Sequence, residues 1–233
     1  EWTYHNWLPY ANTPFPYVAG GPPGKAEVPL YDVLYALGTP VDGRDFCVRA
    51  SVMQYLQNQA LFDGFLSFMW DRYTAVLFWK SQSPWPTLRG ALYDSFLDQT
   101  GGFWGTASSL RPPVSAVLDQ LSLKVRVVNR GGSPLGRATT VTAEMWSVED
   151  GSAYGSGPVI VGSGAVPANA VAEVGSLPWP SSPSLASPPL LFARLCTSIS
   201  VGDGTSVANS RPSPSSSAPP PQVCRGYLVA KPG

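Results

Sequence analysis

The sequence predicts two segments of different class, an α/β segment over residues 1–112 and an all-β segment over residues 113–233. Apolar residues recur at helical spacing over 43–70, and a run that is apolar on both faces follows over 73–80. A helix followed by a buried strand is typical of α/β proteins. Short runs of alternating apolar and polar residues fill the second half, which predicts an antiparallel β-sandwich of the immunoglobulin type.

The composition supports a packed core and argues against two classes of partner. Of the 233 residues, 44% are hydrophobic, and the 15 basic side chains balance the 15 acidic ones. A neutral chain lacks the basic surface that binds nucleic acid or an anionic membrane. No apolar run approaches the roughly 20 residues that span a bilayer. We therefore expect neither a nucleic-acid partner nor membrane insertion.

The first half is predicted to contain one long helix. An aromatic, proline-rich start leads to a short helix near 30–37, and Asp42 then provides a suitable N-cap. The long amphipathic helix follows over 43–70. Its apolar or core-facing positions are Phe46, Ala50, Met53, Gln57, Ala60, Leu61, Phe65 and Phe68.

The run at 73–80 is predicted to be a strand buried on both faces, which requires neighbouring strands in a sheet covered by helices. The first half supplies no second strand of this kind, so we expect the sheet partners to come from another polypeptide or from a lost N-terminal part. A loop over 81–85 and the Gly101-Gly102 break lead to a short helix over 103–110. The proline pair after Arg111 marks the predicted domain boundary.

The second half is predicted to contain six or seven short strands. Their ranges are 121–128, 141–146, 157–166, 171–176, 191–199 and 223–229. The Ser- and Pro-rich stretch over 202–222 is predicted to be a long loop between the last two strands.

Cysteine and histidine give little support to a metal site. His5 is the only histidine, no paired ligand spacing occurs, and Cys47 falls in the helical pattern. Cys196 and Cys224 lie in predicted strands, where they either form a disulfide or are two small buried apolar residues. We expect no metal and no cofactor.

Several runs in the first half resemble glycoside hydrolase family 2, in the branch of exo-β-glucosaminidases and plant-type endo-β-mannosidases. The runs include Tyr55-Leu56-Gln57, Leu77-Phe78-Trp79-Lys80 and Gln99-Thr100-Gly101-Gly102-Phe103-Trp104-Gly105. The opening residues 1–10 look like the plant mannosidases in particular. The resemblance is dense over residues 1–112, and beyond 113 it is one of architecture.

This resemblance implies the C-terminal part of a (β/α)8 TIM barrel followed by an immunoglobulin-like β-sandwich. Residues 43–70 would precede the last barrel strand, 73–80 would be that eighth strand, and 103–110 would be the final helix. The family's two catalytic glutamates end the fourth and seventh strands, which lie upstream, so we assign no catalytic residue here. The comparison makes Asp94 and Asp98 structural.

The resemblance places four substrate-binding candidates in this chain. Trp79 matches a tryptophan that packs against the sugar in this family. The alternative is that Trp79 is a core tryptophan that caps the barrel. Trp85 would flank the adjacent subsite, and Lys80 and Gln82 would hydrogen-bond sugar hydroxyls. Barrel active sites lie at the strand ends where these residues fall.

The expected function is that of a C-terminal portion or processed subunit of a retaining β-glycosidase, foremost a β-mannosidase acting on mannoside-containing glycans. A related β-glucosaminide is the other substrate class that the resemblance implies. The alternative is a non-catalytic structural or carbohydrate-binding component of a larger assembly. The expected partners are the rest of the barrel and a glycan, and a vacuolar, lysosome-like or extracellular location is favoured.

Overall fold

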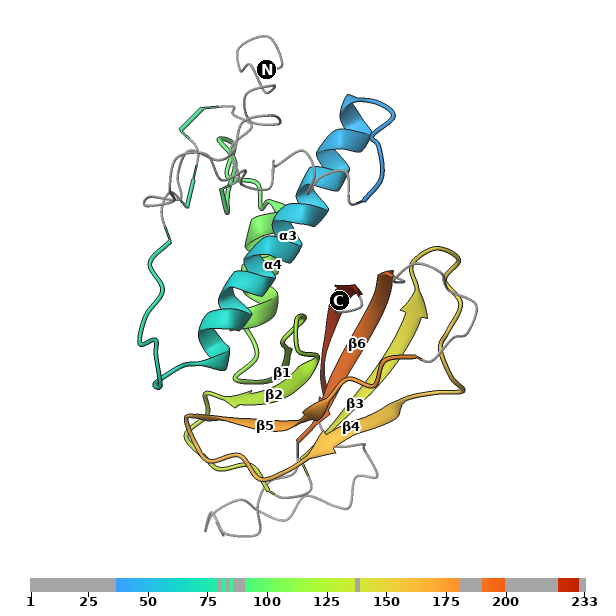
Figure 1. Ribbon diagram of the computed structural model, residues 1–233. Coiled ribbons are helices and arrows are strands. Elements are labelled where there is room, and N and C mark those ends of the chain that lie inside the picture. The colour runs from blue at the N-terminus through green and yellow to red at the C-terminus, as the bar shows by residue number, and fades with distance from the viewer. Residues whose placement is uncertain are drawn as a thin grey trace, which may run out of the picture. The chain divides into compact units, whose positions relative to one another are not determined.

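The computed structural model describes residues 37–78, 81–82, 84–85, 91–136, 139–180, 190–199 and 222–230. The named elements are α3 (Gly43–Ser67), α4 (Gly101–Leu110), β1 (Val114–Leu118), β2 (Lys124–Asn129), β3 (Thr140–Ser147), β4 (Val159–Ser163), β5 (Ala170–Ser176), β6 (Leu190–Ser198) and β7 (Gln222–Ala230) (Figure 1). The helix predicted near 30–37, except residue 37, and the stretch predicted as a loop at 202–222, except residue 222, lie outside the described residues.

The chain divides into two compact units. The first unit contains residues 1–61 and 77–107, and the second contains residues 62–76 and 108–233. Helix α3 therefore contributes residues to both units.

The predicted N-cap of α3 is confirmed. The backbone N–H of Asp45 donates to Oδ1 of Asp42 at 2.8 Å, and Oδ2 of Asp45 accepts from the N–H of Val41 at 3.0 Å. This reciprocal pattern satisfies two backbone donors at the start of the helix. The Val41 N–H, together with Arg49 one turn on, holds the pKa of Asp45 below its usual value. The helix ends at Ser67, before the predicted limit at residue 70.

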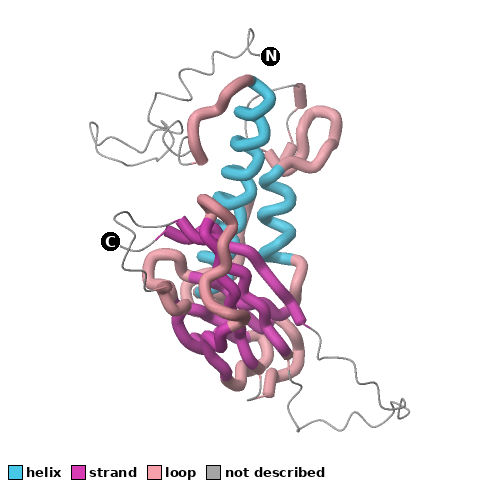
Figure 2. The backbone as a smooth tube through the Cα atoms, turned by 90° about the vertical axis from the view of Figure 1, so that its right-hand side faces the viewer, coloured by secondary structure: helices cyan, strands magenta, loops and turns pink. Residues whose placement is uncertain are grey.

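Helices α3 and α4 pack through glycines. A Cβ atom at Gly101 would lie 1.9 Å from the carbonyl oxygen of Ser51, and one at Gly105 would lie 2.1 Å from that of Tyr55. Only glycine therefore allows the two backbones to approach this closely at these two positions. Figure 2 shows the two helices side by side. Helix α4 begins at Gly101, two residues before the predicted start.

The strand predicted over 73–80 is not formed in its described part. Residues 73–78 contain only an isolated bridge between Tyr73 and Met69, and Leu77 is 95% exposed. A strand with two apolar faces needs neighbours that satisfy its backbone and cover its side chains. No strand of the described chain pairs with residues 73–78. This run therefore has neither strand partners for its backbone nor neighbouring strands that cover its side chains. The prediction of a buried strand is wrong for these residues.

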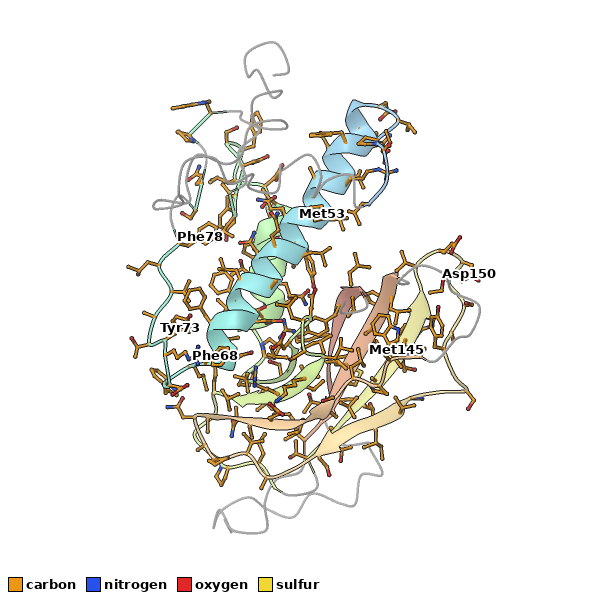
Figure 3. The ribbon with its side chains drawn as sticks, viewed as in Figure 1. Met53, Phe68, Tyr73, Phe78, Met145 and Asp150 are labelled. Carbon is orange, nitrogen blue, oxygen red and sulfur yellow. A yellow bond between two sulfur atoms is a disulfide. The ribbon has the colours of Figure 1, made fainter. Side chains whose placement is uncertain are left out.

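The second unit contains a seven-stranded antiparallel sheet with the order β1-β2-β5-β4-β3-β6-β7. Its two halves, β1-β2-β5 and β4-β3-β6-β7, are joined through the single pair Gly162 and Gly175. The hydroxyl of Tyr227 on β7 donates to the carbonyl oxygen of Ala116 on β1 at 3.0 Å, so the sheet is nearly closed. These features agree with the predicted β-sandwich, and buried side chains such as Met145 fill its interior (Figure 3).

Strand β1 was missing from the predicted strands because all five of its residues are buried. Val114, Ala116 and Leu118 belong to the sandwich core. On the other face, Val117 packs with Leu66 of α3 and with Val128 of β2. A strand covered on both faces shows no alternation of apolar and polar residues, and this alternation is the signal that predicts the other strands.

A buried ion pair connects the last turns of α3 to β7. Nη2 of Arg225 donates to both carboxylate oxygens of Asp63, at 2.7 and 2.8 Å, and also to Oγ of Ser109 at 3.0 Å. The two charged side chains are 2% and 4% exposed. Burial raises the pKa of Asp63, and the adjacent guanidinium opposes that rise.

Tyr227 completes this cluster. Its hydroxyl lies 3.1 Å from Oδ2 of Asp63, and it donates to Ala116 as described above. Burial raises the pKa of Tyr227 well above its usual value, and the Asp63 carboxylate raises it further. The hydroxyl therefore stays protonated and remains a donor.

Cys196 and Cys224 face each other in register on β6 and β7 and form a disulfide. The alternative of two unpaired apolar residues is therefore wrong. Cys47 is free and exposed.

The first prediction concerns the buried ion pair. Asp63→Asn keeps the shape of the side chain but leaves Arg225 buried without a counter-charge, so we expect the free energy of unfolding to fall by about 3–5 kcal/mol. Glu144→Gln, which breaks the more exposed pair with Arg194, should change it by less than about 1 kcal/mol. Urea unfolding of both variants measures the difference, and equal losses would contradict the prediction.

The second prediction concerns the disulfide. Reduction should lower the free energy of unfolding by about 2–4 kcal/mol, because the cross-link restricts the unfolded chain between Cys196 and Cys224. Thermal unfolding with and without a phosphine reductant measures this. A Cys47→Ser control should retain the full effect, and Cys224→Ser should abolish it. A reductant effect that persists in Cys224→Ser would count against the assignment.

Candidate functional site

The predicted substrate-binding residues fall in a segment that the structure describes only in part. Trp79 and Lys80 lie outside the described residues. Gln82 is exposed, and Trp85 is 61% exposed. The structure therefore brings none of the four together in a defined pocket, and their binding role stays a prediction.

Backbone pairing fixes the position of Gln82 in the first unit. Gln82 forms an isolated parallel bridge with Tyr93, whose N–H donates to the carbonyl oxygen of Ser81 at 2.9 Å. The Tyr93 ring packs on Phe103 of α4, with 5.2 Å between the ring centroids. The helix thus supports the chain at Gln82 through one intervening tyrosine.

The loop that carries Tyr93 is anchored to both helices. Nε2 of Gln54 on α3 donates to the carbonyl oxygen of the buried residue Ala91 at 2.9 Å. Oγ1 of Thr100 donates to the carbonyl oxygens of Ala91 and Leu92. The carbonyl oxygen of Thr100 also accepts from the N–H of Trp104 in the first turn of α4. The Thr100-Gly101 junction therefore connects loop and helix.

Asp94 organises this loop. Its Oδ1 accepts from the N–H of Phe96 at 2.8 Å and from that of Asp98 at 2.9 Å. This is an ordinary task for aspartate in a turn. In the described part of the chain, the Asp98 carboxylate accepts no hydrogen bond. The structural role expected for Asp94 thus has a specific geometric basis.

The described site residues are suited to binding rather than to proton transfer. Ser81, Gln82, Pro84 and Trp85 offer a hydroxyl, an amide and an indole, but no carboxylate or imidazole. Such groups hydrogen-bond and stack, whereas retaining glycoside hydrolysis needs two carboxyl groups. Across the described residues, no group of three potential metal ligands occurs, and no helix is long and apolar enough to cross a membrane.

Sequence reasoning missed the Asp63–Arg225 pair, although one signal pointed to it. In the run 223–229, Arg225 shares the inward phase of the strand with Val223, Tyr227 and Val229. A lone cation on an apolar face predicts a buried partner. Nothing in the local pattern identified Asp63, which is 162 residues away.

Comparisons with known proteins confirm the resemblance. No protein-family profile matches the chain. The chain is 33% identical over 153 residues to the mannosylglycoprotein endo-β-mannosidase of Lilium longiflorum, in a match that covers 66% of the chain and 14% of that enzyme. It is 25% identical over 138 residues to the exo-β-D-glucosaminidase of Amycolatopsis orientalis, covering 58% of the chain and 13% of that enzyme. The chain thus spans about one seventh of the length of these relatives.

Solved structures support the same relationship at the level of fold. The exo-chitosanase of Amycolatopsis orientalis matches 88% of the chain and 22% of its own, with a TM-score of 0.66 and 21% identity. The β-D-mannosidase of Dictyoglomus thermophilum matches 81% and 20%, with a TM-score of 0.54 and 12% identity. The chain is therefore similar in sequence to a mannosylglycoprotein endo-β-mannosidase and an exo-β-D-glucosaminidase, and similar in fold to an exo-chitosanase and a β-D-mannosidase.

The third prediction separates a structural from a catalytic role for the loop aspartates. Asp94→Ala should lower the free energy of unfolding of the first unit by about 1 kcal/mol, because two backbone N–H groups lose their acceptor. Asp98→Ala is the matched control and should change it by less than about 0.5 kcal/mol. Thermal unfolding measures both. An equal fall of the free energy of unfolding in both variants would contradict this structural role of Asp94.

Proposed function

We propose that the chain is the C-terminal portion, or a processed subunit, of a retaining β-glycosidase. It would complete a (β/α)8 barrel with residues 1–112 and add an immunoglobulin-like sandwich over 113–233. The observation that carries this proposal is the similarity to the Lilium longiflorum enzyme, which extends over 66% of this chain but only 14% of that enzyme.

Exposed apolar side chains in the first unit support a missing barrel partner. In the described part of this unit they are Val41, Val48, Val52, Leu61, Leu77, Trp85, Phe96, Leu97 and Trp104. Single exposed apolar residues are ordinary, but this number of them within one small unit is what a unit covered by another polypeptide would have, and we propose such a cover here. The proposed occupant is the remainder of the barrel.

The proposed substrate is a β-mannoside in a mannose-containing glycan, and the reaction is hydrolysis with retention. Two carboxyl groups about 5–5.5 Å apart would act as acid/base and nucleophile, and both would come from the upstream part of the barrel. This chain would supply Trp79 as an apolar platform for the sugar ring, Trp85 beside the next subsite, and Lys80 and Gln82 as hydrogen-bonding groups.

The disulfide supports a location on the secretory route. Disulfides persist in oxidising compartments and are rare in the cytosol. A vacuolar, lysosome-like or extracellular location therefore fits both the Cys196–Cys224 bond and a glycan substrate.

Peptide-mapping mass spectrometry of the native particle tests the subunit proposal. We expect peptides from an upstream barrel polypeptide that contains both glutamates, together with hydrolysis of an aryl β-mannoside. A barrel partner without either glutamate, or the absence of any partner, would overturn the assignment as part of a working glycosidase.

The fourth prediction tests the platform role. Trp79→Ala in the active particle should lower kcat/KM for the aryl mannoside by at least about tenfold, equivalent to 1.36 kcal/mol of transition-state stabilisation. Ile160→Ala removes a 72% exposed apolar side chain from β4 of the second unit and should leave kcat/KM unchanged. Both variants should keep the parent's thermal midpoint. Unchanged turnover in Trp79→Ala would refute the platform role without touching the subunit assignment.

A further inference from the structure

We propose that the second unit carries its own carbohydrate-binding pocket, at the C-terminal end of α3, which takes one pyranose unit of a neutral glycan. The cavity has a volume of about 330 Å³ and is lined by residues 67–71, 169–171, Arg126 and Glu173. Ligand pockets begin at about 300 Å³, so this cavity suits a ligand of monosaccharide size. All of the lining residues belong to the second unit.

Trp70 provides an apolar surface in this pocket. Its side chain is 56% exposed, and its Nε1 donates to Oδ1 of Asn169 at 3.0 Å, which restrains the indole. Both residues have positive φ, 69° for Trp70 and 52° for Asn169. A bulky residue in this left-handed region is unusual, and such conformations are concentrated at binding sites.

Asn169 also offers unused hydrogen-bond donors. Its Oδ1 accepts from Trp70, which leaves the two N–H groups on Nδ2 pointing away from that bond. Among the described residues, no acceptor lies within hydrogen-bond distance of Nδ2. The amide is therefore held in place on one side and available on the other.

Arg126 offers a second set of donors. Its side chain is only 17% exposed, and the nearest ion-pair contact joins its Nη2 to Oε2 of Glu173 at 3.6 Å, beyond hydrogen-bond length. The guanidinium lies over the ring of Phe68, 5.1 Å from the centroid, and Figure 3 shows Phe68 at the end of α3. No acceptor in the described chain hydrogen-bonds this guanidinium. A largely buried donor group of this kind favours a ligand that brings acceptors.

The charges at this cavity are arranged in pairs, which suits a neutral ligand. Asp71 and Glu173 contribute two carboxylates and Arg126 one guanidinium. Arg72 pairs with Asp71, with 3.8 Å between Nε and Oδ2, and its guanidinium lies 4.8 Å from the centroid of the Phe68 ring. Lys124 neutralises part of the Glu173 charge, with 3.0 Å between Nζ and Oε1. Both carboxylates thus have a cationic partner, and the charges at the cavity are largely compensated, which suits an uncharged ligand with hydroxyl groups.

A pyranose matches these groups. Its hydroxyls accept from Arg126 and Asn169 and donate to Asp71, while its C–H face packs on the Trp70 indole. The proposal uses no residue of the 79–85 segment, so it stands or falls independently of the proposed hydrolysis.

Saturation-transfer difference NMR on the full chain tests this pocket. The probes are methyl β-D-mannopyranoside, methyl N-acetyl-β-D-glucosaminide and inorganic phosphate. We expect saturation of ring C–H protons in at least one sugar. Trp70→Ala should weaken that sugar's binding by at least about tenfold, through loss of the stacking surface. Asn169→Gly, which retains the left-handed backbone, should weaken it by at least about threefold.

Two controls accompany the pocket variants. Trp104→Ala should bind the sugar as the parent chain does, because this residue does not line the pocket. Circular dichroism should show that Trp70→Ala and Asn169→Gly remain folded. The proposal is overturned if neither sugar binds, if binding is unchanged in both pocket variants, if binding is lost in Trp104→Ala alone, or if phosphate displaces the sugar.

Discussion

The buried ion pair between Asp63 and Arg225 is the interaction on which much of the second unit depends. A carboxylate and a guanidinium that are almost fully buried are each very unfavourable without the other, so the fold must bring them together. One lies on α3 and the other on β7, while Tyr227 bridges Asp63 to the backbone of β1. This is why the end of α3 and the residues after it belong with the sandwich rather than with the rest of their helix.

The same arrangement explains which elements the sequence could predict. Helix α3 has a strong N-cap and a long run at helical spacing, and both signals are local. Strand β3 has one solvated face and shows the expected alternation, so it was found. Strand β1 is covered by the sandwich core on one face and by Leu66 on the other, and its period is hidden. The strand predicted over 73–78 is not formed, for the opposite reason. Its apolar residues indicate side chains that a partner would cover, but they do not indicate whether that partner is present.

The candidate sites show a similar limit. Residues 79–85 became candidates only through resemblance, because a tryptophan after an apolar run has no chemical signature of its own. Trp70 and Asn169 are 99 residues apart, and their contact depends on two left-handed turns that no pattern of apolar residues encodes. In contrast, the position of Arg225 on the inward face of its strand predicts a buried partner. Charge on a buried face can thus be read from sequence, whereas a pocket assembled from two turns cannot.

The disulfide and the ion pair specify the register of β7 by independent means. Cys224 and Arg225 are consecutive, so they point to opposite faces of the strand. Cys224 is exposed and bonded to its directly paired neighbour Cys196, whereas Arg225 points inward to Asp63. A slip of one residue would carry Arg225 to solvent, leave Asp63 buried without its cation and break the alignment of the cysteines. Because β7 also supplies Tyr227, which binds β1, holding this one register determines how the sheet closes and how the last turns of α3 are attached.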